Sequence, residues 1–266
     1  MPGQERGPRS HGAFAALLVA AIFAFGGLMA LGIWQVKRLA WKEDLIARVQ
    51  RLVHAPPVAA PGPAAWPTLE RSADEYRHVI VRGQFTNDRE TFIAATTEMG
   101  AGYWVLTPLH TDQGFWVLVN RGFIPSELRD PAKRTAPVGE QQVAALLRLT
   151  EPGGGLLRSN DSAAGRWYSR DVAAIAAARG LGSEAVAPYF VDATAASATA
   201  HSWPRPGMTV LQFSNNHRVY AATWFALALM LACGIGFFVV DERRMRRKQR
   251  HSGDAPLAAP DVPVRR

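Results

Sequence analysis

Cysteine is almost absent from this chain of 266 residues: Cys233 is the only one, and it lies inside a long apolar run. The polar region before that run therefore has no disulfide bond, no thiolate metal site and no attachment point for a c-type haem. A Cu(I) site is excluded there too. Such sites need cysteine or methionine ligands, and this region has only Met99 and Met208, far apart in sequence.

Charged residues are missing from two long stretches, residues 12–36 and residues 219–240. At about 1.5 Å per residue, a helix of either length spans the roughly 30 Å hydrocarbon core of a bilayer. Both stretches are therefore predicted to be transmembrane helices. The first is too long for the apolar part of a signal peptide and has no clear small-residue cleavage site, so we expect an uncleaved anchor.

The charges beside these stretches predict the orientation. Residues 241–250 carry six basic and two acidic residues directly after the second span, whereas only Arg218 lies close to its start. The positive-inside rule then places the C-terminus in the cytoplasm, and two spans place the N-terminus there too. We expect a two-pass protein of the bacterial inner membrane, with a cytoplasmic N-terminus (1–11), a periplasmic domain (37–218) and a basic cytoplasmic tail (241–266).

The net charge of +8 does not indicate nucleic-acid binding. Residues 241–250 supply 6 − 2 = +4 of it, and the long exported region carries little excess charge. The basic segment is explained by topology and by contact with the lipid bilayer, so we expect no nucleic-acid partner.

The exported region is predicted to begin with a helix and a linker. Trp34, Arg38, Trp41 and Leu45 recur at steps of four, three and four, which extends the first helix through residues 37–53. Residues 54–67 contain five prolines and are predicted to be an irregular linker.

The rest of the exported region is predicted to be rich in β-strands. Short stretches of β-branched and aromatic residues alternate with Gly, Pro and Asp turns, and residues 110–114 suit a hairpin loop. One helix is expected in residues 169–180, with Ser169 as its N-cap and Gly180 at its end, and the glycine-rich residues 151–161 are expected to be a flexible connection. About seven strands are expected, in residues 75–85, 91–95, 103–109, 115–125, 142–150, 188–193 and 208–213.

The predicted fold class is therefore an α+β membrane protein. Two transmembrane helices flank a β-rich exported domain, which is antiparallel, barrel-like or sandwich-like, and contains one helix.

Templates for catalysis are missing, and we expect no enzyme. The chain has no His-Glu-x-x-His helix, no Gly-x-Ser-x-Gly elbow, no P-loop and no dinucleotide fingerprint. Among seven histidines, His217 stands apart because it lies at the mouth of the second span, with Tyr220 and Trp224 on the same helical face. It is either an interfacial histidine beside an aromatic belt or an axial ligand to a haem iron, with the rings packing on the macrocycle.

Several segments, in a consistent order, resemble the surfeit locus protein 1 family of cytochrome c oxidase assembly factors. The most specific are Trp34-Gln35-x-x-Arg38, Asn120-Arg121-Gly122 and Asn215-x-His217-x-x-Tyr220-x-x-Thr223-Trp224. Supporting segments are "EYRHVIVRGQF", "GYWVLTPL", "RWYSRD" and "YFVDA". The resemblance implies two membrane helices around an exported domain, in agreement with the hydropathy pattern.

The resemblance also implies a function: a haem a chaperone that delivers or inserts haem a into the largest subunit of haem-copper cytochrome c oxidase. Haem a synthase is a further expected partner. His217 is then the axial ligand of the haem iron, with Asn215 and Asn216 orienting its ring or capping the helix. Tyr220 and Trp224 are expected to pack on the haem, and Trp34 is expected either to do the same or to belong to the aromatic belt at the membrane interface.

Arg121 is expected to project from a tight Asn-Arg-Gly turn and to bind a haem propionate or a partner carboxylate. The other interpretation is a structural arginine. The alternative function is a membrane scaffold that stabilises an oxidase intermediate without binding haem. In that case Arg121 and Arg170 lie on protein-contact surfaces, and His217 is an interfacial residue.

Overall fold

The structure, a computed structural model, describes residues 9–155, 158–182, 185–197, 202–209 and 215–253. It consists of two compact units. A helical unit is formed by the described parts of residues 1–44 and 214–266, and a β-rich unit by those of residues 45–213. The predicted strand in residues 208–213 lies mostly outside the described residues, and Met208 and Thr209 are not in a strand.

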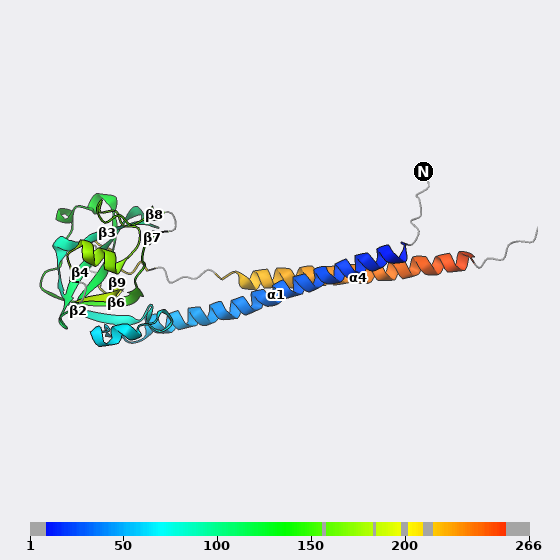
Figure 1. Ribbon diagram of the computed structural model, residues 1–266, viewed down its shortest axis with the longest axis horizontal. Helices are drawn as coiled ribbons and strands as arrows, with labels where there is room; N and C mark the ends of the chain where they lie inside the picture. Colours follow the sequence, from blue (N-terminus) through cyan, green and yellow to red (C-terminus); the bar gives the residue numbers. More distant parts are fainter. Residues whose placement is uncertain (1–8, 156–157, 183–184, 198–201, 210–214, 254–266) are drawn as a thin grey trace, which may run out of the picture. The chain divides into compact units, whose positions relative to one another are not determined.

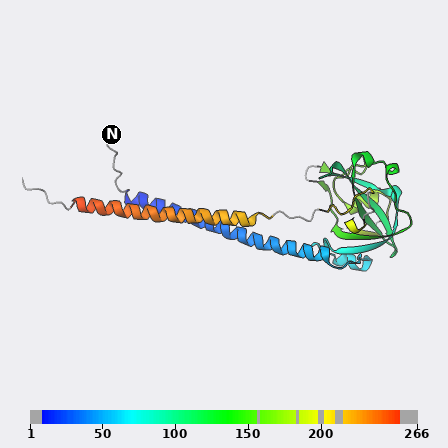
Figure 2. The same cartoon turned by 180° about the vertical axis from the view of Figure 1, so that it is seen from behind.

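Two long helices dominate the chain ends: α1 (His11–His54) and α4 (His217–Gly253). As predicted, α1 continues without a break to the start of the proline-rich stretch. Both helices are long and apolar enough to cross a membrane, as expected of a two-pass membrane protein. Figures 1 and 2 show α1 and α4 side by side from opposite directions.

The two helices meet along a seam with a seven-residue repeat. Phe14 stacks on Phe238 with ring centroids 5.3 Å apart, and the ring of Phe225 lies over Gly32, so the helices run antiparallel. Alternating steps of three and four are the spacing of a left-handed helix pair. Along residues 11–41 of α1, the buried or half-buried positions with this spacing are Phe14, Leu18, Ala21, Phe25, Leu28, Gly32, Gln35 and Leu39, and those of α4 include Ala221, Trp224, Ala228, Leu231, Ile235, Phe238 and Glu242.

The β-rich unit is built on a seven-stranded sheet in the order β1-β2-β6-β9-β5-β4-β3. Because β2 also pairs with β4, five of the strands close into a barrel. The strands are β1 (Val58–Ala59), β2 (His78–Phe85), β3 (Thr91–Thr97), β4 (Gly100–Thr111), β5 (Trp116–Pro125), β6 (Glu140–Leu149) and β9 (Val186–Ala193). The expected β-rich domain, which two apolar helices flank in the sequence, is confirmed.

The barrel is not antiparallel throughout, because β5 and β9 run parallel. A closed ring of five strands cannot alternate direction completely, since alternation around a ring needs an even number of strands. The other four pairs of the ring are antiparallel, so β5–β9 is the one place where closure requires a parallel pair.

Two apolar cores lie on the two faces of the barrel wall. Inside the barrel, alternate residues such as Val79, Val117 and Val191 are fully buried, as the two-residue period of a strand requires. Outside it, helix α3 (Val172–Ala178) covers β3, β4, β5 and β9, with Ile175 packed among Leu118 and other residues of that face.

The proline-rich residues 54–67 are not an irregular linker but close one end of the barrel. Val58 and Ala59 form β1, which pairs with β2. The residues that follow form a 3-10 helix, η1 (Pro63–Thr68). The Trp66 indole and the Tyr189 hydroxyl both donate hydrogen bonds to the carbonyl of Pro61, at 3.0 and 2.7 Å. Burial raises the pKa of the Tyr189 hydroxyl, which therefore stays protonated as the donor.

Two smaller predictions, on the N-cap of the helix and on the glycine-rich connection, are corrected by the structure. The N-cap of α3 is Asp171, whose carboxylate accepts from the Ala174 backbone at 3.1 Å, while the Ser169 hydroxyl donates to the carbonyl of Glu151. Part of the predicted flexible connection, residues 154–155 and 158–159, forms a short ladder of β7 (Gly154–Gly155) and β8 (Arg158–Ser159). Residues 156–157 of that connection lie outside the described residues.

The Asn120-Arg121-Gly122 segment lies inside β5 and is not a turn. Gly122 has φ +124°, and a Cβ there would lie 2.0 Å from the carbonyl oxygen of Arg205. The glycine therefore serves a close backbone approach, at which Phe123 and Arg205 exchange backbone hydrogen bonds of 2.9 Å.

Candidate functional site

His217 is the first residue of α4, and its ring contacts α1. The Nδ1 atom lies 2.7 Å from Oε1 of Gln35, a residue 182 positions away in sequence but in the same helical unit. Gln35 is only 9% exposed and His217 is half-buried. Because water is largely excluded, this hydrogen bond holds the ring more firmly than an exposed one would.

The hydrogen bond sets the tautomer of the neutral imidazole. An amide oxygen can only accept, so Nδ1 carries the hydrogen and Nε2 keeps its lone pair. Within the described part of the chain, no residue forms a hydrogen bond with Nε2. Metal-binding histidines are oriented in the same way, by an acceptor on the nitrogen that faces away from the metal. His217 can therefore offer one oriented nitrogen to a metal.

The aromatic residues of the predicted site lie on both helices. Tyr220 and Trp224 follow His217 in α4, and Trp34 precedes Gln35 in α1. The rings of Trp34 and Tyr220 are 55% and 54% exposed, so they provide apolar surface that no described residue covers, whereas Trp224 is half-buried. Their contact with a cofactor stays a prediction.

The start of α4 is attached to α1 at a second point. Arg218 forms an ion pair of 2.5 Å with Glu43. The role expected of Asn215 and Asn216 in orienting the imidazole is taken by Gln35. Asn216 contributes its backbone carbonyl to the first turn, and the buried Oδ1 of Asn215 has no partner among the described residues.

Arg121 belongs to the barrel and does not project outward as expected. Its side chain is 12% exposed and its Nη1 lies 3.0 Å from Oε1 of Glu90. Glu90 also accepts from both terminal nitrogens of Arg134, at 3.3 and 2.7 Å. The pKa of Arg121 is lowered overall. Burial is the largest cause, the nearby Glu90 carboxylate opposes it, and the positive charge of Arg134 adds to the lowering. The interpretation as a structural ion pair is the one that these contacts favour, and a role toward a haem propionate stays a prediction.

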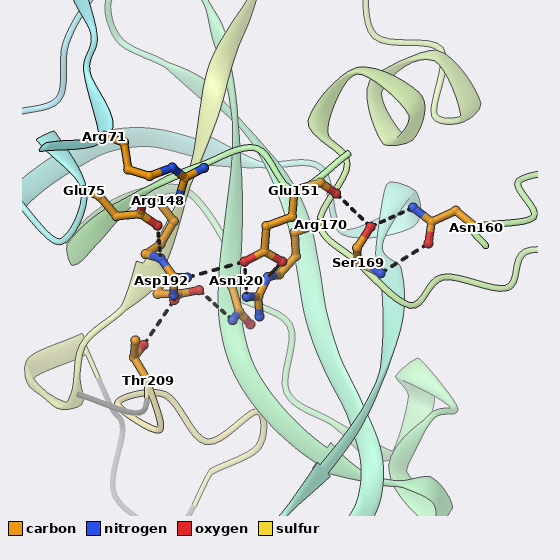
Figure 3. A network of polar contacts seen from close by, with 10 residues as sticks. All are labelled: Arg71, Glu75, Asn120, Arg148, Glu151, Asn160, Ser169, Arg170, Asp192 and Thr209. Carbon is orange, nitrogen blue, oxygen red and sulfur yellow. Dashed lines mark hydrogen bonds and ion pairs between the residues drawn. The ribbon is translucent and has the colours of Figure 1, made fainter. Parts of the chain in front are cut away.

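Arg170, the other candidate arginine, is part of an ion-pair network on the outer face of β5, β6 and β9 (Figure 3). Its Nε and Nη2 bind both oxygens of Glu151, at 2.9 and 2.6 Å. At the centre, Arg148 donates to Asp192, Glu75 and Glu151 at 3.0, 3.2 and 3.4 Å. Asn120 and Thr209 complete the shell of Asp192, at 2.8 and 3.2 Å.

This network satisfies its own charges. Burial lowers the pKa of the Arg148 guanidinium, but the nearby Asp192, Tyr76, Glu75 and Glu151 outweigh that effect, so the pKa is raised overall. Asn120 and Asp192 are directly opposed in the parallel β5–β9 pair, and Arg148 extends from β6. The arrangement joins three strands and leaves little charge for a ligand.

Comparison with known proteins identifies the family. The SURF1 family model matches residues 22–229. The chain is 35% identical to Surfeit locus protein 1 of Homo sapiens over 233 residues, covering 80% of this chain and 72% of the human protein. The chain belongs to the SURF1 family. For Surfeit locus protein 1 of Takifugu rubripes the identity is 34%, over 74% of this chain and 86% of that protein. For a SURF1-like protein of Monosiga brevicollis it is 30%, over 83% and 85%.

The SURF1 match spans both partners of the interhelical hydrogen bond, Gln35 and His217. Gln35 is the site residue that our sequence analysis did not single out, although it lies in the Trp34-Gln35-x-x-Arg38 motif. It is the only amide side chain in the charge-free residues 12–36. A polar residue in such a segment is expensive in lipid and is therefore a signal of function or helix pairing.

Proposed function

We propose that this chain is an assembly factor for haem-copper cytochrome c oxidase that acts as a haem a chaperone and delivers or inserts haem a into the largest oxidase subunit. Membership of the SURF1 family, a family of oxidase assembly factors, supports the assembly role. The haem role rests on one observation, the hydrogen bond from His217 to Gln35, which leaves Nε2 available as a ligand.

The residues present suit a haem better than a bare metal ion. Among the described residues, no group of three or more His, Cys, Asp or Glu side chains is placed to hold a metal ion. A haem iron, when bound, needs only one or two axial ligands from protein, and its macrocycle takes apolar packing. His217 would hold the iron, while Trp34 and Tyr220 supply exposed aromatic surface on the two helices.

The proposed setting is the inner membrane of a bacterium. Both termini are cytoplasmic in this proposal and the barrel is periplasmic, as the basic residues after the second span predict. The partners are the largest oxidase subunit, haem a synthase and the lipid bilayer. No catalytic turnover is proposed, because a chaperone needs a ligand that binds haem and then releases it.

The test is the visible spectrum and extracted haem content of the protein purified from membranes that make haem a. We expect a Soret band in the wild type and its loss in His217→Ala. His54→Ala is the matched control, because His54 is an exposed histidine at the other end of α1 whose Nδ1 lies 2.8 Å from the Gln50 carbonyl oxygen. The control should keep the wild-type spectrum.

The other outcomes would each reject part of the proposal. If the His217→Ala variant keeps the Soret band, the protein binds haem but the axial ligand is another residue. No pigment in the wild type, with oxidase still failing to mature in a deletion strain, would favour the scaffold without haem.

A further inference from the structure

A pocket of about 280 Å³ lies at the end of the barrel opposite η1. It is lined where β2, β5 and β9 end and β6 begins, by residues that include Phe85, Arg121, Val143 and Ala193. The other end is closed by Trp66 and by Tyr189, which both bind the Pro61 carbonyl. The mouth of a barrel is a common place for a ligand site.

Positive charge is in excess beside this pocket. Glu90, Arg121 and Arg134 form a buried cluster whose side chains are 7%, 12% and 3% exposed. Arg134 takes both oxygens of Glu90, and Arg121 shares one of them. Two guanidinium groups therefore share one carboxylate, which leaves the cluster with a formal charge of +1.

The ion-pair network around Arg148 shows what a balanced cluster looks like in the same barrel. There, three arginines (Arg71, Arg148 and Arg170) meet three carboxylates (Glu75, Glu151 and Asp192), and Arg148 alone donates to all three (Figure 3). Among the described residues, Arg121 pairs with one carboxylate oxygen that it shares with Arg134, and its guanidinium lies 5.4 Å from the centre of the Phe85 ring. Burial together with Arg134 lowers the pKa of Arg121. Because a guanidinium stays charged in proteins, its surroundings favour an added anion rather than loss of the proton.

The walls of the pocket determine which anion fits. The described apolar lining residues include Phe85, Val119, Val143, Trp203 and Pro204. The polar lining residues include the uncharged Thr135, Gln141 and Gln142, and Arg121 is the one charged residue among the described residues of the lining. One guanidinium among apolar walls suits a monoanion with an apolar body better than a phosphate dianion, which would need a second free cation.

We propose that this pocket binds a small organic monocarboxylate, with its carboxylate on the Arg121 guanidinium and its apolar body against Phe85 and Trp203. The pocket volume of about 280 Å³ lies at the lower end of the range of roughly 300–1,000 Å³ that is usual for ligand pockets, so the ligand is a small one. The proposal does not depend on haem binding, and it is tested on protein free of haem.

The experiment uses the full chain in lipid nanodiscs, with empty nanodiscs as the blank. The probe is 4-(4-fluorophenyl)butyrate, followed by ¹⁹F line broadening, and the uncharged 4-(4-fluorophenyl)butanamide is the matched ligand. We expect saturable binding of the acid, and binding of the amide that is weaker by about tenfold or more, because the amide cannot pair with the guanidinium.

Two variants of the protein test the site itself. Arg121→Gln should weaken the acid about tenfold or more and leave the amide unchanged, and it should fold because Arg134 still pairs with both oxygens of Glu90. Arg166→Gln removes an exposed arginine that forms an ion pair with Asp161, and this variant should bind as the wild type does. Ala136→Trp fills the pocket from its exposed rim and should abolish binding without touching the core.

The results that would overturn the proposal are equally specific. Absence of saturable binding of the acid to the wild type would reject the site, as would equal binding of acid and amide. Undiminished binding in folded Arg121→Gln would reject the role of the guanidinium. If Arg121→Gln fails to fold, undiminished binding in Ala136→Trp decides against the pocket.

Discussion

At the residue scale, the chemistry of His217 depends on its neighbour on the other helix. The Gln35 amide oxygen accepts from Nδ1, which directs the lone pair to Nε2. Neither helix alone would set this tautomer, because the two residues come from opposite ends of the chain. If His217 holds the haem iron, a change at Gln35 should therefore alter haem binding as well.

We predict that Gln35→Leu weakens haem binding about 10- to 100-fold, the usual cost of removing the residue that orients a metal-binding histidine. Gln35→Glu keeps an acceptor and should retain haem. Because the carboxylate makes the imidazole more basic, the reduction potential of the bound haem should become more negative. Haem affinity is measured by Soret titration and the potential by a redox titration.

The control for this prediction is Gln50→Leu, which removes an exposed glutamine side chain from the same helix. Its haem affinity and potential should match those of the wild type. Equal haem affinity in Gln35→Leu and the wild type would show that the hydrogen bond has no part in ligation, even if His217 itself proved to be the ligand.

At the element scale, the contact between α1 and α4 depends on small residues in the seam. Gly32 is buried, and a Cβ there would lie 2.6 Å from the Phe225 ring. Gly27 lies in the same helix but has nothing within 4 Å of a built Cβ. Gly32 and Gly27 offer a matched test, because replacing either glycine changes the intrinsic helix propensity by the same amount.

We predict that Gly32→Val separates the helices and Gly27→Val does not. The readout is disulfide cross-linking between Phe14→Cys and Phe238→Cys, whose native rings are stacked, in a Cys233→Ser background. Gly32→Val should lower the cross-linking yield severalfold and should also lower haem retention, because the His217–Gln35 bond needs the same approach. Equal yields in the two glycine variants would mean that the seam does not control the helix pair.

A second prediction at this scale concerns the strands that Arg148 joins. Arg148→Met should cost about 3–5 kcal/mol of unfolding free energy, because it leaves buried carboxylates without their partner. Arg166→Met removes an exposed arginine, 63% accessible, and should cost within about 1 kcal/mol. Denaturant unfolding of the full chain, followed by near-UV circular dichroism, compares the two. Equal costs would contradict a structural role for the network.

The elements themselves were largely predictable, because hydropathy and two-residue alternation are local signals. The run from β2 to β6 follows from alternating apolar residues, and the span of α1 follows from the absence of charge. What could not be predicted is how distant segments combine. The proline-rich residues 54–67 look irregular in isolation, and their role in closing the barrel depends on Pro61 meeting Tyr189, 128 positions away.

The candidate site was predictable only in part, for the same reason. His217 stood out because a histidine beside an apolar span is unusual, whereas Gln35 acquires its meaning only when α4 packs on α1. The expected turn and outward projection of Arg121 were wrong because Asn-Arg-Gly is locally typical of a turn, whereas the alternative of a structural arginine is the one that its contacts favour. Gly122 is needed instead for the approach of the Arg205 backbone, which the sequence does not reveal.

At the scale of the whole molecule, one short charged segment predicts which side of the membrane each end of the two spans faces. Residues 241–250 carry six basic residues against two acidic ones. Glu242 is 1% exposed and is paired with Arg246 at 2.9 Å, so it offsets little of the charge that faces the lipid surface. The positive-inside rule counts basic residues near a span and gives acidic ones little weight.

We therefore predict that residue 249 is cytoplasmic and that the barrel is on the outer side. In a Cys233→Ser background, Ser162→Cys on the exposed barrel surface should react with a membrane-impermeant maleimide in intact spheroplasts. Gln249→Cys, exposed near the end of α4, should react only after the membrane is opened. The reverse pattern would invert the topology, and labelling of both in sealed spheroplasts would mean that the two helices do not both cross the bilayer. Only the predicted pattern agrees with the two-pass topology that the basic residues after the second span indicate.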